Sequence, residues 1–155
     1  MSAATEVLCN HPVFRFFRVI SDIPRPSKHE EQISQFLFRW ARERGLEAEQ
    51  DEKLNILIRK PATPGYEGAP GIMLQAHMDM VCEPAPEAEH DFMKDPIHWE
   101  LDGDILSTGR RTTLGADDGI GVAMAMAVLD DDTLSHPALE VLFTTAEEDD
   151  FSGAE

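Results

Sequence analysis

Two segments near the start of the chain have the apolar spacing of amphipathic helices. In the first, the apolar side chains are Val13, Phe16, Phe17 and Ile20. Asn10 is a common N-cap residue type and Pro12 suits a first helical turn. This helix is expected to end before Pro24.

The second helix is predicted by a start signal as well as by its period. Ser27 and Glu30 have the spacing of a capping box, in which each side chain accepts from the other residue's backbone N–H. The apolar stripe that follows consists of Ile33, Phe36, Leu37 and Trp40. Because Gly45 is typical of the position just past a helix end, we expect a helix over residues 27–44.

Three short apolar runs further along the chain predict strands. They cover residues 54–58, 72–75 and 139–144. Residues 119–129 form a helix of small residues, long enough to cross over a sheet. The prediction is an α/β fold with one mixed sheet flanked by helices. Residues 83–104 are acidic, contain prolines and lack a period, so we expect an excursion there and not a separate domain.

Size and charge narrow the class of protein. A chain of 155 residues with 42% hydrophobic residues is expected to fold as one domain. Thirteen Lys and Arg against 30 Asp and Glu give a formal charge of −17, which repels nucleic-acid phosphates and anionic lipid surfaces. No apolar stretch approaches the roughly 18 residues of a membrane-spanning helix. We therefore expect no nucleic-acid partner and no membrane partner.

The two cysteines, Cys9 and Cys82, form no CxxC pair and no disulfide framework, although two thiols can in principle still pair. A reducing compartment is the simpler interpretation. We therefore expect the protein to be cytoplasmic.

Three groups of polar residues follow or precede the predicted elements. His77 and Asp79 come just after the run at 72–75, and residues two apart on an extended chain point to the same side. A carboxylate bonded to an imidazole is the usual support of a zinc-binding histidine. A strand-end histidine with a solvated neighbour is the alternative.

The second group lies in a glycine-rich turn before the crossover helix. It contains Asp117 and Asp118. Either carboxylate could simply be an N-cap at the positive end of the helix. A phosphate-binding loop is disfavoured, because no lysine follows the glycines and two acids repel phosphate.

The third group is a run of four acids just past the strand at 139–144. It begins with Glu147 and Glu148, and a solvated loop is the ordinary interpretation of such a run. All three groups, however, lie at strand ends or at a helix start, where open α/β sheets form their sites. One imidazole with several carboxylates suits a hydrolase that uses two divalent metal ions.

Residues 75–81, 112–121 and 144–148 resemble the motifs of the bacterial aminoacyl-histidine dipeptidases, which are cytosolic dinuclear zinc peptidases also called peptidase D. Residues 55–63 and 90–97 are similar to that family as well. The resemblance extends over nearly the whole chain. It implies a zinc-peptidase catalytic-domain fold, two Zn2+ ions per intact site and a dipeptide substrate.

The resemblance also implies roles for single residues. His77 would bind one metal ion, Asp117 would bridge both ions, and Glu148 would bind the second. Asp79 would orient His77, and Glu147 would be the general base for water attack on the peptide carbonyl. A cis peptide bond between Asp117 and Asp118 is implied as well.

The sequence departs from the family pattern in three ways. Asp118 stands where the family often has Asn, and Asp149 and Asp150 replace less charged residues. The family also continues with a further metal-ligand Asp, a second domain for lid and dimer contacts, and a late metal-ligand His, none of which is in this sequence. Each ion would keep two protein ligands, short of the number zinc usually takes.

We therefore expect residues 1–155 to be a truncated N-terminal part of a metallopeptidase catalytic domain, incomplete and inactive in this form, whose intact relative cleaves Xaa-His dipeptides. Self-association through exposed core is possible. The alternative is a non-enzymatic truncated homologue that acts as a weak metal binder or an interaction protein. The three motifs argue against an unrelated acidic binding module.

Overall fold

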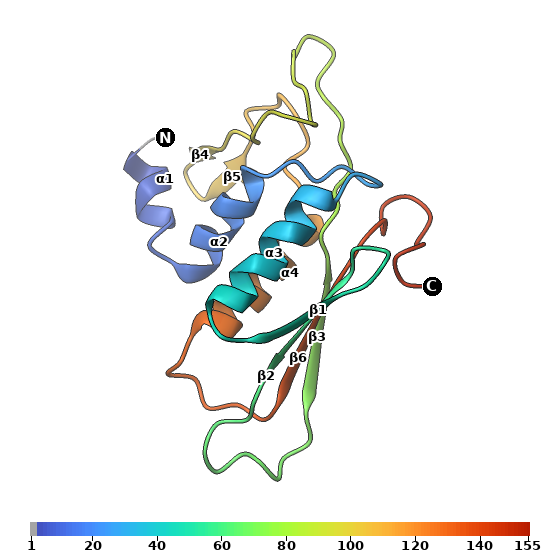
Figure 1. The fold of residues 1–155 in the computed structure, drawn as a ribbon. Coiled ribbons are helices and arrows are strands. Elements are labelled where there is room, and N and C mark those ends of the chain that lie inside the picture. Colours follow the sequence, from blue (N-terminus) through green and yellow to red (C-terminus); the bar gives the residue numbers. More distant parts are fainter. Residues whose placement is uncertain (1–2) are drawn as a thin grey trace.

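The computed structural model describes residues 3–155 and contains one main sheet with helices on one of its faces (Figure 1). The helices are α1 (Ala3–Leu8), α2 (Pro12–Ser21), α3 (Glu31–Glu43) and α4 (Ala116–Asp130). The strands are β1 (Glu47–Gln50), β2 (Ile56–Lys60), β3 (Ile72–His77), β4 (Glu100–Asp102), β5 (Ile105–Ser107) and β6 (Leu139–Thr144). The predicted α/β class is confirmed.

The main sheet has the strand order β1-β2-β6-β3 and is mixed, as predicted. β6 pairs antiparallel with β2 and parallel with β3. Val141 lies opposite both Ile58 and Leu74, so the three predicted strands are neighbours in one sheet. Residues 61–71 join β2 to β3, which are not neighbours because β6 lies between them.

Strand β1 was not predicted, because its sequence gives no apolar signal. Of its four residues only Ala48 is buried, and the others are exposed polar or charged side chains. Its place in the sheet comes from antiparallel pairing with β2, in which Ala48 lies opposite Ile58. Tertiary pairing therefore decides this edge strand.

The helices confirm the predicted periods but correct both predicted starts. The N-cap of α2 is His11, not Asn10, and it makes no side-chain cap hydrogen bond. α3 begins at Glu31 and has no capping box. The Ser27 hydroxyl instead donates to the Asp79 carboxylate (2.7 Å), and the Glu30 carboxylate accepts from the backbone N–H of Ala146 (2.9 Å). Partners distant in sequence have replaced the local ones.

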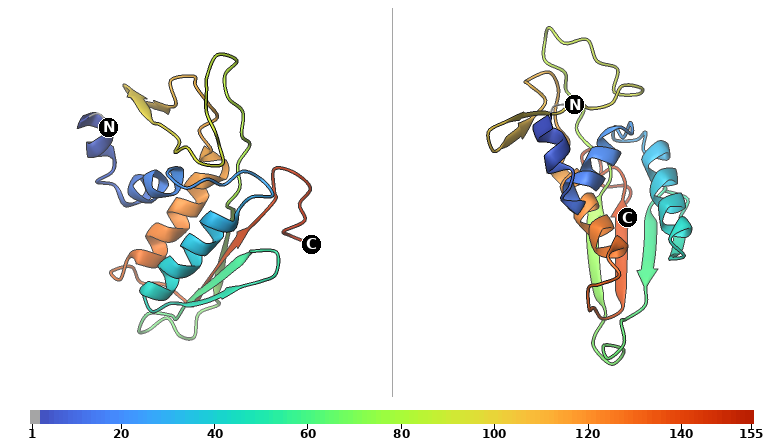
Figure 2. Two further views of the ribbon diagram at one scale, coloured as in Figure 1. Left: turned by 45° about the horizontal axis from the view of Figure 1, so that its top comes forward. Right: turned by 90° about the vertical axis from the view of Figure 1, so that its left-hand side faces the viewer.

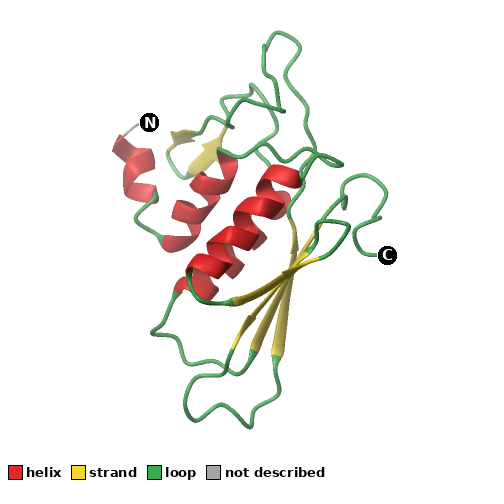
Figure 3. Ribbon diagram, viewed as in Figure 1, coloured by secondary structure: helices red, strands yellow, loops and turns green. Residues whose placement is uncertain are grey.

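The core lies between the sheet and the helices. α3 covers β1 and β2, α4 covers β3, and α2 packs on α4 (Figures 1 and 3). The fully buried side chains from these elements include Phe17, Ile20, Ile33, Leu37, Ile56, Ile58, Val122, Met126, Val141 and Phe143. Among the described elements, no helix covers the other face of the sheet.

Residues 83–104 form the predicted excursion, but its end also contributes a small hairpin, β4–β5, that was not predicted (Figure 2). The excursion is attached to α2 by two contacts. The ring centroids of Trp99 and Phe17 are 4.9 Å apart, and the backbone N–H of Ile97 donates to the carbonyl of Ser21. No helix among residues 3–155 has the length and apolar character needed to cross a membrane.

Candidate metal centre

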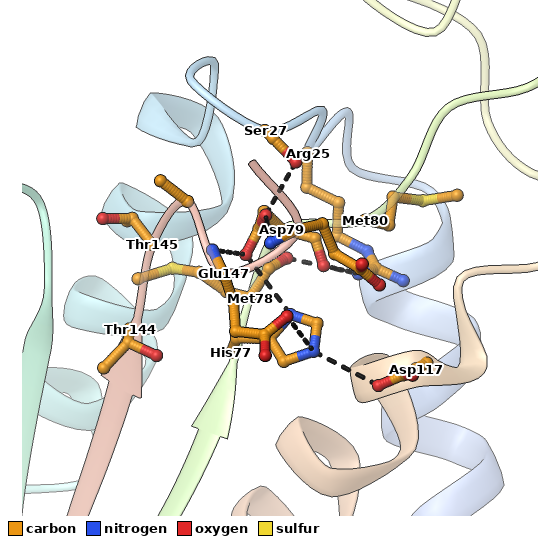
Figure 4. A network of polar contacts seen from close by, with 12 residues as sticks. Arg25, Ser27, His77, Met78, Asp79, Met80, Asp117, Thr144, Thr145 and Glu147 are labelled. Atoms are coloured by element: carbon orange, nitrogen blue, oxygen red, sulfur yellow. Dashed lines mark hydrogen bonds and ion pairs between the residues drawn. The ribbon is translucent and has the colours of Figure 1, made fainter. Parts of the chain in front are cut away.

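The three polar groups of the sequence meet at one edge of the sheet. Since β3 and β6 are parallel and His77 lies opposite Thr144, both strands deliver the residues that follow them to the same edge. The start of α4 reaches this edge from the helical layer (Figure 4). The sheet and the helix, both backed by the core, therefore position these side chains.

Asp79 is the most enclosed member of the group, with a side-chain exposure of 0%. One carboxylate oxygen lies 3.3 Å from His77 Nδ1, and the other accepts from the Ser27 hydroxyl. The backbone N–H groups of Glu147 and Glu148 also donate to the carboxylate, one to each oxygen, at 3.1 Å. Burial alone raises the pKa of Asp79, but these hydrogen bonds outweigh it and lower the pKa to about 2. Asp79 is therefore an anion that joins the end of β3 to the turn after β6.

The second nitrogen of His77 faces the remaining carboxylates. Nε2 lies 3.2 Å from Asp117 Oδ1 and 3.7 Å from Glu147 Oε2. Burial lowers the pKa of His77, but the bond and charge of Asp79, then the contacts with Asp117 and Glu147, raise it to about 9. Without a cation, the imidazolium neutralises part of this acidic site.

The first residues of α4 include Asp117 and Asp118, whose backbone angles are not helical and whose side chains have different partners. The peptide bond between Asp117 and Asp118 is cis, as the resemblance implies. Asp117 directs its carboxylate toward His77, whereas Asp118 accepts from the backbone N–H of Gly121 at the start of the regular helix. The N-cap residue of α4 is Gly115, which makes no side-chain cap hydrogen bond, so neither aspartate is the N-cap residue itself. Burial raises the pKa of Asp118, and the like charge of Asp117 adds to this effect.

The four acids after β6 fall into two pairs with different neighbours. Ligand atoms of His77, Glu147 and Glu148 all lie within 4.8 Å of one another. Asp149 and Asp150 are exposed and face Lys28, at 3.8 Å and 2.5 Å. Glu148 is exposed as well and only Glu147 is half-buried, so the group near His77 contains one solvated acid, whereas Asp149 and Asp150 have their contacts with Lys28.

The residues present fit a divalent metal. Imidazole nitrogen and carboxylate oxygens are the donors that zinc and similar ions take, and a carboxylate on the other ring nitrogen is the usual support of such a histidine. Asp117 reaches His77 but is not part of the compact group formed by His77, Glu147 and Glu148. Glu147, the predicted base, and Glu148, the predicted ligand, both lie close to His77, so this distance alone does not distinguish their roles.

Sequence reasoning missed two supports of this centre. Arg25 donates to backbone carbonyls on both sides of the site, and Glu30 holds the turn before Glu147 through the N–H of Ala146. Ser27 was assigned to a helix cap. These residues lie 52 or more positions from their partners in sequence, so no local sequence pattern could predict the contacts.

No family model matches the sequence. A Bacillus subtilis protein described as a dinuclear metal-binding peptidase of the M20 family shares the fold, with a TM-score of 0.53 and 18% identity over 95% of this chain and 37% of its own.

Two nearer relatives are more specific. The chain is 48% identical over 147 residues to the cytosol non-specific dipeptidase of Escherichia coli K12, covering 95% of this chain and 30% of the relative. The crystal structure of aminoacylhistidine dipeptidase from Vibrio alginolyticus superposes with a TM-score of 0.89 at 45% identity, over 92% of this chain and 29% of that one. The resemblance to the aminoacyl-histidine dipeptidases is confirmed, and the chain spans about a third of the length of these relatives.

Proposed function

We propose that residues 1–155 form the N-terminal part of the catalytic domain of a metal-dependent dipeptidase that acts in the cytoplasm. The observation that carries the proposal is the double engagement of His77. A buried carboxylate holds Nδ1, while Nε2 faces Asp117 and Glu147. The names of the two nearer relatives, a cytosol dipeptidase and an aminoacylhistidine dipeptidase, support dipeptides as the substrate class.

Two Zn2+ ions are the proposed cofactor, and His77, Asp117 and Glu148 are the residues that would hold them. When bound, such ions polarise a peptide carbonyl and lower the pKa of water. Asp79 accepts from His77 Nδ1, so that Nε2 is left to bind metal as a neutral nitrogen. Asp79 is thus a positioning residue in this scheme.

Glu147 is the proposed general base. Its backbone N–H is bonded to Asp79 and its carboxylate faces the ring of His77, so its position is set by two neighbours. The carboxylate accepts a proton from the attacking water and passes it to the leaving amine as the peptide bond breaks. Glu147 therefore carries the same proton from the water to the leaving amine and ends the reaction ionised again.

We further propose that these 155 residues alone form an incomplete site. With Asp117 shared, His77 and Glu148 leave each ion two protein ligands, whereas zinc in catalytic sites usually has three. Weak metal binding without turnover would fit the alternative function, a metal-binding or interaction protein.

The test compares this chain with the same chain extended by the remainder of the E. coli relative. Hydrolysis of a Xaa-His dipeptide and of a dipeptide without histidine is measured with excess Zn2+. The extended chain is expected to turn over, and Glu147→Gln to abolish turnover. Glu140→Gln is the matched control, because Glu140 lies on β6 and pairs with Arg59.

Three results would contradict the proposal. Full activity of Glu147→Gln would remove the assigned base, and activity independent of Zn2+ would remove the cofactor. Turnover of about 1 per second or faster by residues 1–155 alone, a rate typical of enzymes, would show that the site is complete without further ligands.

A further inference from the structure

Arg25 is the largest side chain fully enclosed by the fold, with a relative exposure of 2%. It lies between α2 and α3, in a segment that runs beside the residues after β3. The backbone N–H of Met80 donates to the carbonyl of Arg25, and Pro26 forms a parallel bridge with Met80. Both the main chain and the side chain of Arg25 are therefore attached to the end of β3.

The guanidinium joins two segments that carry site residues. One terminal nitrogen donates to the carbonyls of Met78 (3.2 Å) and Asp79 (3.1 Å), and the other donates to the carbonyl of Gly115 (2.6 Å) (Figure 4). The first two carbonyls follow His77 directly, and Gly115 lies two residues before Asp117. One planar group thus connects the loop of the predicted histidine to the loop of the predicted bridging carboxylate.

Two glycines at the start of α4, one just before it and one in its first turn, leave room for the Arg25 guanidinium. A Cβ at Gly115 would lie 2.5 Å from the Arg25 terminal nitrogen, and a Cβ at Gly119 would lie 2.7 Å from it. These glycines flank Asp117 and Asp118 on both sides. The start of α4 is therefore shaped around the guanidinium as well as bonded to it.

Burying a cation without an ion pair is unfavourable, and the three hydrogen bonds of Arg25 all go to backbone carbonyls. Burial lowers the pKa of Arg25 to about 10, against the favourable charges of nearby groups including Asp79 and Asp118. An apolar residue of similar volume would fill a core position without this penalty. Filling space therefore does not explain the choice of arginine.

We propose that Arg25 is a positioning residue for the metal site: it sets the placement of Asp117 relative to His77 before a cation binds. The inference rests on the proposed function, because it presumes that these two residues share a metal site. Arginine suits the task, since its rigid fork reaches several acceptors at once, whereas the single ammonium of lysine does not.

The experiment titrates residues 1–155 with Co2+ and follows the visible absorption of the bound ion, which reports its ligands, alongside urea unfolding. The variants are Arg25→Met, Arg25→Lys and His77→Ala. Arg18→Met is the matched control, because Arg18 is also largely enclosed and also donates to a backbone carbonyl, that of Ile97, away from the site.

Arg25→Met is expected to weaken Co2+ binding by about tenfold or more, the range for residues that support metal ligands, and to change the absorption of the bound ion. Arg25→Lys is expected to lose affinity too, because it keeps the charge but not the fork. Arg18→Met should lower stability and leave Co2+ affinity and absorption as in the unchanged chain. If Arg25→Met does not fold, Arg25→Lys carries the test.

Two further outcomes separate the inference from the proposed function. If His77→Ala abolishes Co2+ binding while Arg25→Lys and Arg25→Met bind as the unchanged chain does, Arg25 has only a structural role and the inference is wrong. If His77→Ala binds Co2+ like the unchanged chain, the metal site itself is wrong and both proposals fall.

Discussion

Two aspartates at the same edge of the sheet are held very differently. Asp79 has no exposed side-chain surface and accepts hydrogen bonds from Ser27 and two backbone N–H groups beside its contact with His77. The Asp117 side chain is 87% exposed, and its carboxylate contacts only the ring edge of His77 that bears Nε2, at 3.2 Å, among the contacts of the described residues. One half of the centre is therefore arranged by folding itself, whereas the position of the Asp117 carboxylate depends on its turn and on what binds there.

This contrast has a physical origin. The residues around Asp79 come from β3, from the turn after β6 and from the segment before α3, so several parts of the fold enclose it at once. Asp117 lies in a turn at the start of α4, where its backbone is fixed through Gly115 but its side chain faces solvent. Substitutions of Asp79 should therefore act on stability, and those of Asp117 on metal binding.

The largest effect on stability is expected for Asp79→Ala. It leaves several buried donors without an acceptor, and breaking such a buried charged network costs about 3 to 5 kcal/mol of unfolding free energy. Urea unfolding without metal measures it. Asp104→Ala, at an exposed aspartate in the β4–β5 turn, is the control and should change little. A loss for Asp79→Ala no larger than that of the control would remove the contrast.

A smaller loss is expected for Ser27→Ala. The hydroxyl donates to an ionised carboxylate, and such bonds contribute about 1.5 to 3 kcal/mol. Because the partner is Asp79 and not a helix N–H, the loss should largely disappear when Asp79 is already alanine. A double-mutant cycle by urea unfolding measures this coupling, and additive losses would restore the capping interpretation.

Asp117→Asn should leave stability within about 0.5 kcal/mol, as for exposed positions generally. Its Zn2+ affinity should fall by at least about tenfold, the lower bound for residues that support a metal site. Calorimetric titration with Zn2+ measures the affinity. Asp149→Asn removes the same charge from an exposed acid near Lys28 and is the control. Equal affinity losses in both variants would indicate a general charge effect and not a ligand.

The last prediction concerns the other end of β3 and should not affect unfolding free energy appreciably. Ile72 and Met73 are 47% and 54% exposed on a strand that pairs on one side only. Exposed apolar residues on an unpaired edge favour association, so residues 1–155 should self-associate at high concentration. Sedimentation should show less association for Met73→Lys. A concentration-independent monomer in the unchanged chain would contradict this prediction.

Local patterns were sufficient for the main elements of the fold. Helical spacing marked α2 and α3, and apolar runs marked β2, β3 and β6. In β2 and β6 alternate residues are buried, as the period of a strand predicts. In β3 the run is apolar, but only its last two residues are buried. β1 and the β4–β5 hairpin carry no such repeat. They have few buried side chains, and their existence depends on pairing with another strand.

For the candidate site, local patterns were enough to predict the residue types and their place at element ends: His77 and Asp79 after an apolar run, Asp117 and Asp118 before a helix, and Glu147 after another apolar run. The parallel register of β3 and β6 is what brings the two strand ends together. The spacing of residues along the chain does not predict this register, because it arises from pairing between strands that are far apart in sequence.

The partner of each polar side chain, by contrast, depends on how the chain packs in three dimensions. Ser27 donates to Asp79 and not to a helix N–H, the N-cap of α4 is Gly115 and neither aspartate, and Arg25 is buried against the carbonyls of two segments. The reason is energetic: a buried charge must be satisfied by whatever donors or acceptors surround it, and those come from residues far apart in sequence. A local helix cap contributes less free energy than an unsatisfied buried charge costs, so the distant partner is chosen where the two conflict.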